Sequence, residues 1–218
     1  MLINYKQIMA IQKDGPNGPV IGKFGVHYGY MLNGQNIIRG PRRPNSKKPS
    51  PAMLLNREKM KVANAFTRML IPIFRYGYKN LAPKGSRVGA VQQAQAQVFK
   101  ECIEINEEGR PYVNPEKILV FRGDLPPLHT CSVERRGDLL HFQWTPPSGL
   151  LGASYKINIL LHEETYNADL KIGVAEVNAG KCEVPMIGMT KGPLHVYVGI
   201  IEGYTGQMSD SVYLGIVE

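Results

Sequence analysis

Acidic residues are nearly missing from the first part of the chain. Among residues 1–80 only Asp14 and Glu58 are acidic, whereas 14 residues are Lys or Arg. Residues 81–218 hold 16 acidic and 12 basic residues, so the formal charge of +8 combines a strongly basic part with a mildly acidic one. This split indicates two modules with different partners. The basic module is expected to face a polyanion or an acidic protein surface.

Long hydrophobic runs are also missing. No apolar run approaches the roughly 20 residues that span a bilayer. Polar residues interrupt the first ten positions, which argues against a secretory signal. We therefore expect no membrane partner. The three cysteines are odd in number and far apart, which favours a reducing compartment and argues against a disulfide framework or a zinc knuckle. They are Cys102, Cys131 and Cys182.

Recognisable catalytic patterns are missing as well. No two histidines have metal-ligand spacing, and Tyr166 stands where a zincin helix starting at His162 would need its second histidine. Gly22-Lys23 is followed by Phe24 rather than by Ser or Thr, which argues against a phosphate loop. No Gly-x-Ser-x-Gly elbow and no obvious carboxylate pair is present. We therefore expect no enzyme, cofactor, metal or small-molecule substrate. A glycan or cell-wall hydrolase is a third hypothesis.

The first structural pattern that the sequence does contain is that of a β-hairpin. Phe24 to Leu32 and Gln35 to Arg39 flank Asn33-Gly34, the favoured dipeptide of a type I′ turn. Glycines recur in the first of these strands, where they usually mark a bulge or a close approach of another backbone. These glycines are Gly22, Gly25 and Gly29.

A basic arm is expected to follow the hairpin. Gly40 to Pro51 reads GPRRPNSKKPSP, and its prolines rule out a helix or a central strand. The arm could track nucleic-acid phosphates, dock on an acidic protein groove, or only remain solvated. Aromatic residues are not interleaved with the basic ones, which weakens a mode based on stacking single-stranded bases. We predict that the partner-binding residues, for protein or nucleic acid, are Arg39, Arg42, Arg43, Lys47, Lys48, Arg57, Lys59 and Lys61.

Two helices are expected next. Ser50-Pro51 is a good helix start, and apolar residues at three- and four-residue steps predict a helix of roughly 25 residues. Pro72 is expected to kink it and Gly77 to end it. A second helix is expected to open at Ser86. Its apolar stripe would be Val91, Ala94, Val98 and Cys102, with Gln92, Gln93, Gln95 and Gln97 mostly off the stripe.

From about residue 118 the sequence changes to short alternating runs separated by turn clusters. This spacing predicts an antiparallel β-sandwich. The only tryptophan, Trp144, is placed like the early core tryptophan of fibronectin type III modules. His141 and His195 are expected to be surface or edge histidines. The expected strands are 118–121, 131–135, 139–144, 155–162, 172–177, 181–185, 194–201 and 211–217.

The predicted fold class is therefore α+β with two domains. Residues 1–115 would hold a glycine-rich β-hairpin, the basic arm and two helices. Residues 116–218 would form the antiparallel β-sandwich of fibronectin type III or immunoglobulin-like type. The cysteine pair of a true immunoglobulin domain is missing.

The order of several segments resembles a known family. Ile21–Gly25, Ile37–Pro41 and the helix from Phe66 to Tyr78 stand in the N-terminal part. Leu119–Pro126, Leu140–Trp144 and Val196–Gly199 follow, and the chain closes with Ser209–Gly215, the most specific segment. Together they resemble an uncharacterised domain-of-unknown-function family of Bacteroidota and their bacteriophages. Met53-Leu54-Leu55 and Cys102 depart from the family pattern.

The resemblance implies a phage-type structural protein without catalytic residues. Our leading hypothesis is a non-enzymatic virion component, in a ring or collar at the neck or tail, that docks through the hairpin and the basic arm. Its partners would be other virion proteins and copies of itself in a ring-forming homo-oligomer. It would be located in the virion after assembly in the bacterial host cytoplasm. The alternative is a DNA-binding or packaging accessory protein that uses the same basic segment.

Overall fold

The computed structural model describes residues 10–32, 34–41, 48–82, 88–128, 130–150, 152–163, 167–189 and 192–218. Within this part the chain is α+β, with three α-helices and several antiparallel sheets. Internal contacts divide the chain into two compact units. The first unit comprises Met1–Ser50 and Pro83–Gly89, and the second comprises Pro51–Ala82 and Ala90–Glu218.

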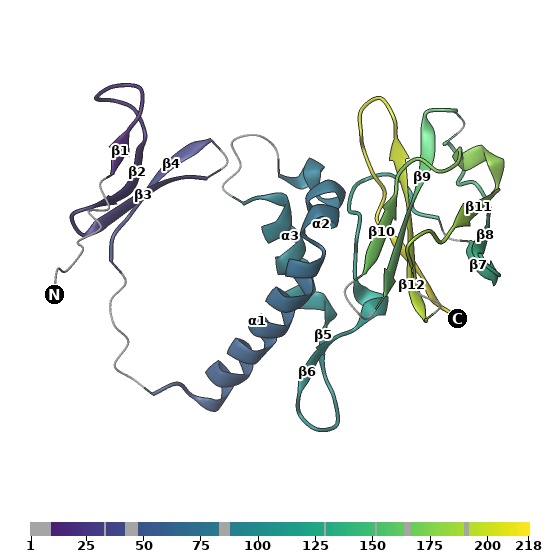
Figure 1. Cartoon of the computed structure of the whole chain (residues 1–218), viewed down its shortest axis with the longest axis horizontal. Helices are drawn as coiled ribbons and strands as arrows, with labels where there is room; N and C mark the ends of the chain where they lie inside the picture. Colours follow the sequence, from purple (N-terminus) through teal and green to yellow (C-terminus); the bar gives the residue numbers. More distant parts are fainter. Residues whose placement is uncertain are drawn as a thin grey trace. The chain divides into compact units, whose positions relative to one another are not determined.

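The first unit contains a four-stranded antiparallel sheet in the order β1-β2-β3-β4 (Figure 1). Leu32 at the end of β3 lies opposite Gln35 at the start of β4. Gly34 between them has a φ of 83°, while Asn33 of the expected turn lies outside the described residues. The strands are β1 (Ile11–Gln12), β2 (Val20–Phe24), β3 (His27–Leu32) and β4 (Gln35–Arg39).

The expected single strand from Phe24 to Leu32 is wrong in extent. Gly25 has a φ of 56°, a left-handed conformation that glycine tolerates, and the chain turns there between β2 and β3. Gly29 serves a different purpose. A Cβ atom on Gly29 would lie 2.1 Å from the Val20 carbonyl oxygen, so the expected close approach of another backbone is confirmed at this glycine.

Two consecutive helices open the second unit. α1 (Pro51–Met69) and α2 (Ile71–Gly77) are separated at Leu70, whose φ of −104° and ψ of 19° depart from helical values. Pro72 stands in the first turn of α2, where its missing N–H removes no helical hydrogen bond. The start at Pro51, the interruption beside Pro72 and the end at Gly77 are confirmed. A 3₁₀ turn, η1 (Lys79–Leu81), follows.

Gly77 ends α2 and also lets it approach a neighbouring segment. A Cβ atom on Gly77 would lie 2.0 Å from the carbonyl oxygen of Val120. The Gly77 carbonyl accepts a hydrogen bond from the backbone N–H of Arg122 at 3.1 Å. The terminator predicted from the sequence is therefore also a packing contact.

The next helix starts later than expected, and the expected opening residue, Ser86, lies outside the described residues. α3 (Ala90–Gln97) follows a non-helical Val88 and Gly89, and it continues as a π-helical turn, η2 (Val98–Cys102). Gln97, expected off the apolar stripe, is buried, because its amide donates to the carbonyl of Lys117 at 3.0 Å. The expected stripe is confirmed for its buried members Ala94, Val98 and Cys102.

The remaining strands are short and antiparallel. Two of them form a hairpin, β5 (Ile103–Ile105) and β6 (Pro111–Val113). The others form a sheet in the order β11-β8-β7 and a sheet in the order β10-β9-β12-β13. These strands are β7 (Cys131–Arg136), β8 (Leu139–Trp144), β9 (Tyr155–Glu163), β10 (Ala168–Lys171), β11 (Lys181–Pro185), β12 (Leu194–Glu202) and β13 (Val212–Val217); the 3₁₀ turns are η3 (Pro115–Lys117) and η4 (Val177–Ala179).

Six of the eight expected strands are present with closely similar bounds, namely β7, β8, β9, β11, β12 and β13. The strands expected at 118–121 and 172–177 are wrong. The first is an apolar segment outside any ladder, where the backbone N–H of Val120 donates to the hydroxyl of Ser211 at 2.8 Å. β10 was not expected, because its Asp169 and Lys171 have low strand propensity.

One hydrophobic core lies between the two larger sheets of the second unit. It joins β8 residues such as Phe142 and Trp144 to β9 and β12 residues such as Ile159 and Val196. The indole N–H of Trp144 donates to the carbonyl of Val177 at 2.6 Å, so its only polar atom is satisfied in the core.

A second core lies between the helices and the other face of the β10-β9-β12-β13 sheet. Phe74 and Tyr78 of α2 belong to the same buried cluster as Leu160 of β9 and Tyr197 of β12. Figure 1 shows the helices beside this sheet. The change to short alternating runs in the sequence predicts a domain boundary after residue 115. The compact units of the structure separate after residue 50 instead. The boundary after residue 115 stays a prediction about which part folds alone.

Candidate docking surfaces

The predicted basic residues fall into separate groups. Arg39 and Lys48 belong to the first unit. Arg57, Lys59 and Lys61 belong to α1 in the second unit. The other three predicted residues lie outside the described part of the chain. They are Arg42, Arg43 and Lys47.

The sheet β1–β4 buries almost nothing of its own. In the described part of the first unit no hydrophobic side chain is buried, and Gly29 is the one buried residue. Apolar side chains lie exposed on both faces, because consecutive strand residues point to opposite sides. Those exposed by more than a third are Ile11, Val26, Tyr28, Tyr30, Met31 and Ile38 of the sheet and its turns.

One face of this sheet combines aromatic rings with cations. Tyr28 in β3 lies opposite Lys23 in β2 and opposite Arg39 in β4, so all three side chains share a face. Tyr30, two residues on, lies opposite Ile37 on the same face. Tyr28 is 51 % exposed and Tyr30 is 39 % exposed. We call these five residues the tyrosine face.

A surface hollow of about 420 Å³ lies on the tyrosine face. Its walls are Tyr28, Tyr30, Arg39 and the adjoining Gly40 and Pro41. The sequence prediction missed the tyrosines because they precede the basic arm. The hairpin register, readable from the Asn-Gly signal, would have placed Tyr28 opposite Arg39.

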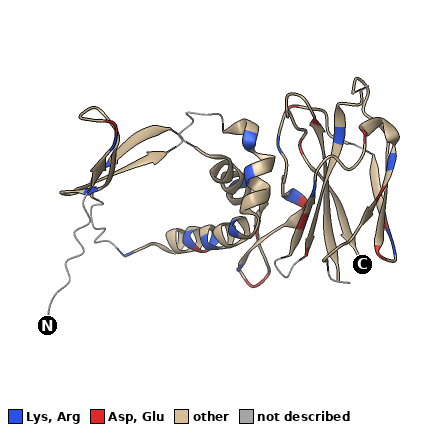
Figure 2. Ribbon diagram, turned by 45° about the horizontal axis from the view of Figure 1, so that its top comes forward, with Lys and Arg blue, Asp and Glu red and all other residues tan. Residues whose placement is uncertain are grey.

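A second surface is the outward side of α1. Residues three, four, seven or eleven apart share one side of a helix, and Arg57, Lys61 and Arg68 follow this spacing and are exposed. No ion pair joins them to another residue in the described part of the chain. Arg75 of α2 is also exposed. Figure 2 shows Lys and Arg along these helices. We call these four residues the basic ridge.

Lys59 does not belong to the basic ridge. It is half-buried, on the side of α1 that also carries the buried Ala63 and the half-buried Phe66. Sequence reasoning missed Arg68 and Arg75 because it followed the density of charges along the chain. A helical projection of the predicted helix would have found Arg68, since it stands seven residues after Lys61.

The β5–β6 hairpin carries acidic and apolar side chains. Glu104 accepts hydrogen bonds from Lys117 Nζ at 2.8 Å, Tyr112 Oη at 2.8 Å and Asn114 Nδ2 at 3.1 Å. The Lys117 ammonium, followed by the Asn114 and Tyr112 donors, lowers the pKa of the Glu104 carboxyl to about 2. Tyr112 is 42 % exposed, and Ile105 is 46 % exposed.

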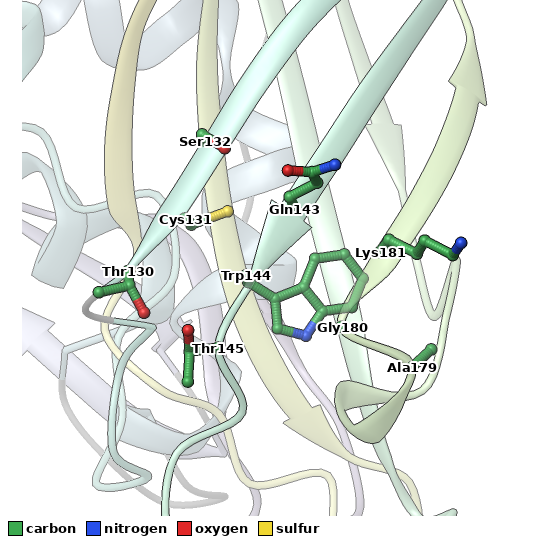
Figure 3. A pocket seen from close by; sticks show the side chains of 9 residues that line it. All are labelled: Thr130, Cys131, Ser132, Gln143, Trp144, Thr145, Ala179, Gly180 and Lys181. Carbon is green, nitrogen blue, oxygen red and sulfur yellow. The ribbon is translucent and has the colours of Figure 1, made fainter.

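One end of the β11-β8-β7 sheet has a surface hollow of about 630 Å³. Figure 3 shows its labelled side chains, which come from β7, β8 and β11 and the residues next to them at one end of the sheet. They include no histidine and no carboxylate. The lining residues are Thr130, Cys131, Ser132, Gln143, Trp144, Thr145, Ala179, Gly180 and Lys181.

The histidines of the second unit differ from expectation at one position. His141 is half-buried and lies 3.2 Å from Glu183 on the neighbouring strand. His195, expected at the surface or an edge, is buried; its Nδ1 lies 2.8 Å from the hydroxyl of Tyr213. His195 is buried because the helices cover this face of the sheet, where Phe66 of α1 lies against the neighbouring His162.

The thiols have the properties of structural cysteines. Burial raises the pKa of Cys102 to about 11, of Cys131 to about 12 and of Cys182 to about 11. A thiol with a raised pKa is a poor nucleophile near neutral pH. In the described part of the chain no group of three or more His, Cys, Asp or Glu residues could hold a metal ion. No helix there is long and apolar enough to cross a membrane.

Comparison of the chain with protein-family models finds no match, and comparison with curated protein sequences finds no significant match.

Proposed function

We propose that the chain is a non-enzymatic structural protein of a phage-type virion, a ring or collar component of the neck or tail. It docks on neighbouring subunits through the sheet β1–β4 and the basic arm after it. The observation that carries this proposal is the sheet without a buried hydrophobic side chain. The resemblance of the motif order to a phage-associated family supports the same function.

In the described part of the chain, the sheet β1–β4 lacks a hydrophobic layer to pack against. A small sheet is stable when one face packs on a hydrophobic layer. Here Ile11 is 62 % exposed, Val26 63 % and Ile38 55 %. Exposed apolar side chains on both faces show that neither face has such a layer within the described residues. Docking on a partner supplies the missing layer, and the basic residues beside it favour an acidic partner surface.

Phage structural proteins often carry a β-sandwich module that presents a binding surface of its own, and the second unit is suited to this role. We propose that its two larger sheets form a fibronectin type III-like sandwich. The strand orders β11-β8-β7 and β10-β9-β12-β13, which share one core around Trp144, support this assignment. Fold-level analogy alone assigns no function to it.

Mass spectrometry of purified particles tests the proposal. The chain is expected among the virion proteins, at a constant ratio to the other structural proteins through successive purification steps. In infected cells it would first be cytoplasmic. Particles that lack the chain would contradict the proposal.

The basic ridge favours a second candidate function, a DNA-binding or packaging accessory protein. Four exposed cations without an acidic partner in the described part of the chain could contact phosphates on one side of a duplex. With four phosphate contacts, the logarithm of the binding constant for duplex DNA is expected to fall with the logarithm of the salt concentration at a slope of about −3.6.

Replacing Arg57, Lys61, Arg68 and Arg75 by Ala tests this candidate. Under the DNA-binding function, duplex binding is lost while assembly into particles persists. Under the structural function, assembly depends on the sheet and survives the change, and duplex binding is weak from the start. Lys181→Ala, on the outer side of the β11-β8-β7 sheet, serves as the matched control.

A further inference from the structure

The tyrosine face has the composition of an interface centre. Tyrosine and arginine dominate binding energy at protein interfaces, where they lie in desolvated hollows surrounded by a polar rim. Tyr28, Tyr30 and Ile37 supply the apolar centre, and Lys23 and Arg39 stand at its two sides. Among the described residues of the first unit, Asp14 is the only acid, and it lies in the turn before β2. A complementary surface would be apolar at its centre and acidic at its rim.

The β5–β6 hairpin supplies apolar and acidic side chains of this kind. Residues 103–113 hold three glutamates and one basic residue, Arg110. Ile105 is 46 % exposed and Tyr112 is 42 % exposed, on opposite faces of the hairpin, because Ile105 lies opposite Pro111 and Tyr112 lies opposite Glu104. Glu104 is held by Lys117 and Glu108 by Arg110, while Glu107 makes no ion pair with another described residue. The hairpin therefore places the exposed Ile105 close to an acidic tip, Glu107 and Glu108.

We propose that the tyrosine face of one copy binds the β5–β6 hairpin of a second copy. This inference rests on the proposed structural function and names the partner of the same sheet. The two surfaces differ, so the contact is heterologous, and repeating it generates a ring or a filament. Opposite charges at the rim fix the register and accelerate association, and the tyrosines and Ile105 supply the buried centre.

Nucleic acid is the competing occupant of the tyrosine face. Aromatic rings beside cations also bind single-stranded bases and their phosphates. The second row of the face, Tyr30 opposite Ile37, is apolar and offers no phosphate contact. The chain also carries its own hairpin with an exposed Ile105 and an acidic tip. These two observations favour the second copy.

Sedimentation velocity of the purified full chain, from low to high micromolar concentration, tests the proposal. The wild type is expected to associate reversibly at low salt and to dissociate at high salt. Tyr28→Ala with Tyr30→Ala is expected to lower the association constant about tenfold or more. Tyr204→Ala, a tyrosine 91 % exposed on the second unit, is the matched control and is expected to change nothing.

Charge reversal identifies the partner surface. One protein carries Lys23→Glu with Arg39→Glu, and the other carries Glu107→Lys with Glu108→Lys. Each alone places like charges at the contact and is expected to remain monomeric. Mixed in equal amounts, the two proteins meet through opposite charges at every contact, and association is expected to return.

Three results would overturn the inference. They are a wild type that stays monomeric over the whole range, variants that associate like the wild type, and a mixture that remains monomeric. Binding of a fluorescent oligo-dT that is lost in the tyrosine variant, without self-association of the wild type, would assign the face to nucleic acid instead. The chain could still be found in particles in each case, so these results leave the proposed structural function to its own test.

Discussion

The hydroxyl of Tyr197, in the middle of β12, donates a hydrogen bond to the backbone carbonyl of Pro115 at 2.9 Å. Pro115 is the last residue of the N-terminal domain, residues 1–115, that the sequence pattern predicts. The side chain of Tyr197 is buried, in the same cluster as Phe74 and Tyr78 of α2. The sheet and the helices thus share their interior at the position where the chain was expected to divide.

A fragment comparison follows from this shared core. Residues 51–218 are expected to unfold cooperatively, because both cores of the second unit are complete. Residues 116–218 alone would expose Leu160 and Tyr197 and are expected to aggregate or to unfold at a much lower temperature. Circular dichroism melting and light scattering measure both. A fragment 116–218 as stable as fragment 51–218 would support the boundary after residue 115 instead.

Tyr197→Phe isolates the hydrogen bond itself. The change keeps the buried ring and removes the donor to Pro115, so the free energy of unfolding is expected to fall by about 1 kcal/mol. Urea denaturation followed by fluorescence measures it. Tyr204→Phe, on an exposed tyrosine, is the control and is expected to have no effect. Equal stability of Tyr197→Phe and the wild type would show that water replaces the donor.

Gly77→Ala tests the approach of α2 to the segment after it. The new methyl group would lie 2.0 Å from the carbonyl oxygen of Val120, and backbone must move to relieve the contact. We expect a loss of about 2–4 kcal/mol in the free energy of unfolding. Gly152→Ala has its nearest neighbour at 3.6 Å and is expected to change stability by less than about 0.5 kcal/mol. Similar values for the two variants would contradict this packing.

The raised pKa values of the cysteine thiols predict how the stability of the protein changes at alkaline pH. Burial raises the pKa of Cys102 to about 11 and of Cys131 to about 12, from an ordinary value of 9.0. The unfolded thiols ionise first as pH rises, so the stability they contribute is complete below pH 9 and is lost as pH rises through the folded values. Native protein at pH 8 should react slowly with a thiol reagent, and unfolded protein rapidly. Fast reaction of native thiols would contradict their burial.

The lowered pKa of Glu104 predicts a loss of stability at acidic pH. Its folded pKa of about 2 lies below the ordinary 4.5, so its contribution is present above the ordinary value and is lost as pH falls toward 2. Carboxyl ¹³C shifts of Glu104 measure the folded pKa. In the variant Lys117→Met, which removes the largest cause of the shift, the titration is expected to move back toward 4.5. An unchanged titration would show that Tyr112 and Asn114 suffice.

Most of the second unit could be predicted because its signals are local. Alternation in Leu139–Trp144 and Lys181–Pro185 gave those strands with their exact bounds. Pro51 and Gly77 likewise marked the limits of the helical segment. Local pattern failed at 118–121, since a buried apolar segment looks the same whether it joins a ladder or is bonded by Ser211.

Burial was harder to predict than secondary structure. His195 alternates like a surface residue, yet the helices cover its face of the sheet. Gln97 was expected outside the apolar stripe but is buried. Its side-chain amide can be buried because it donates a hydrogen bond to the backbone carbonyl of Lys117, a residue distant in the sequence. The tyrosine face was missed because the prediction followed the density of basic residues along the chain and not the cross-strand register that the Asn-Gly turn implies.

Amide hydrogen exchange of the sheet β1–β4 tests the central claim most directly, that this sheet requires a docking partner. In dilute isolated chain, the amides of Val20–Phe24, His27–Leu32 and Gln35–Arg39 are expected to exchange far faster than those of β9 and β12, because no hydrophobic layer protects them. In assembled particles the same amides are expected to be protected. Protection in the dilute chain equal to that of β9 and β12 would contradict the account.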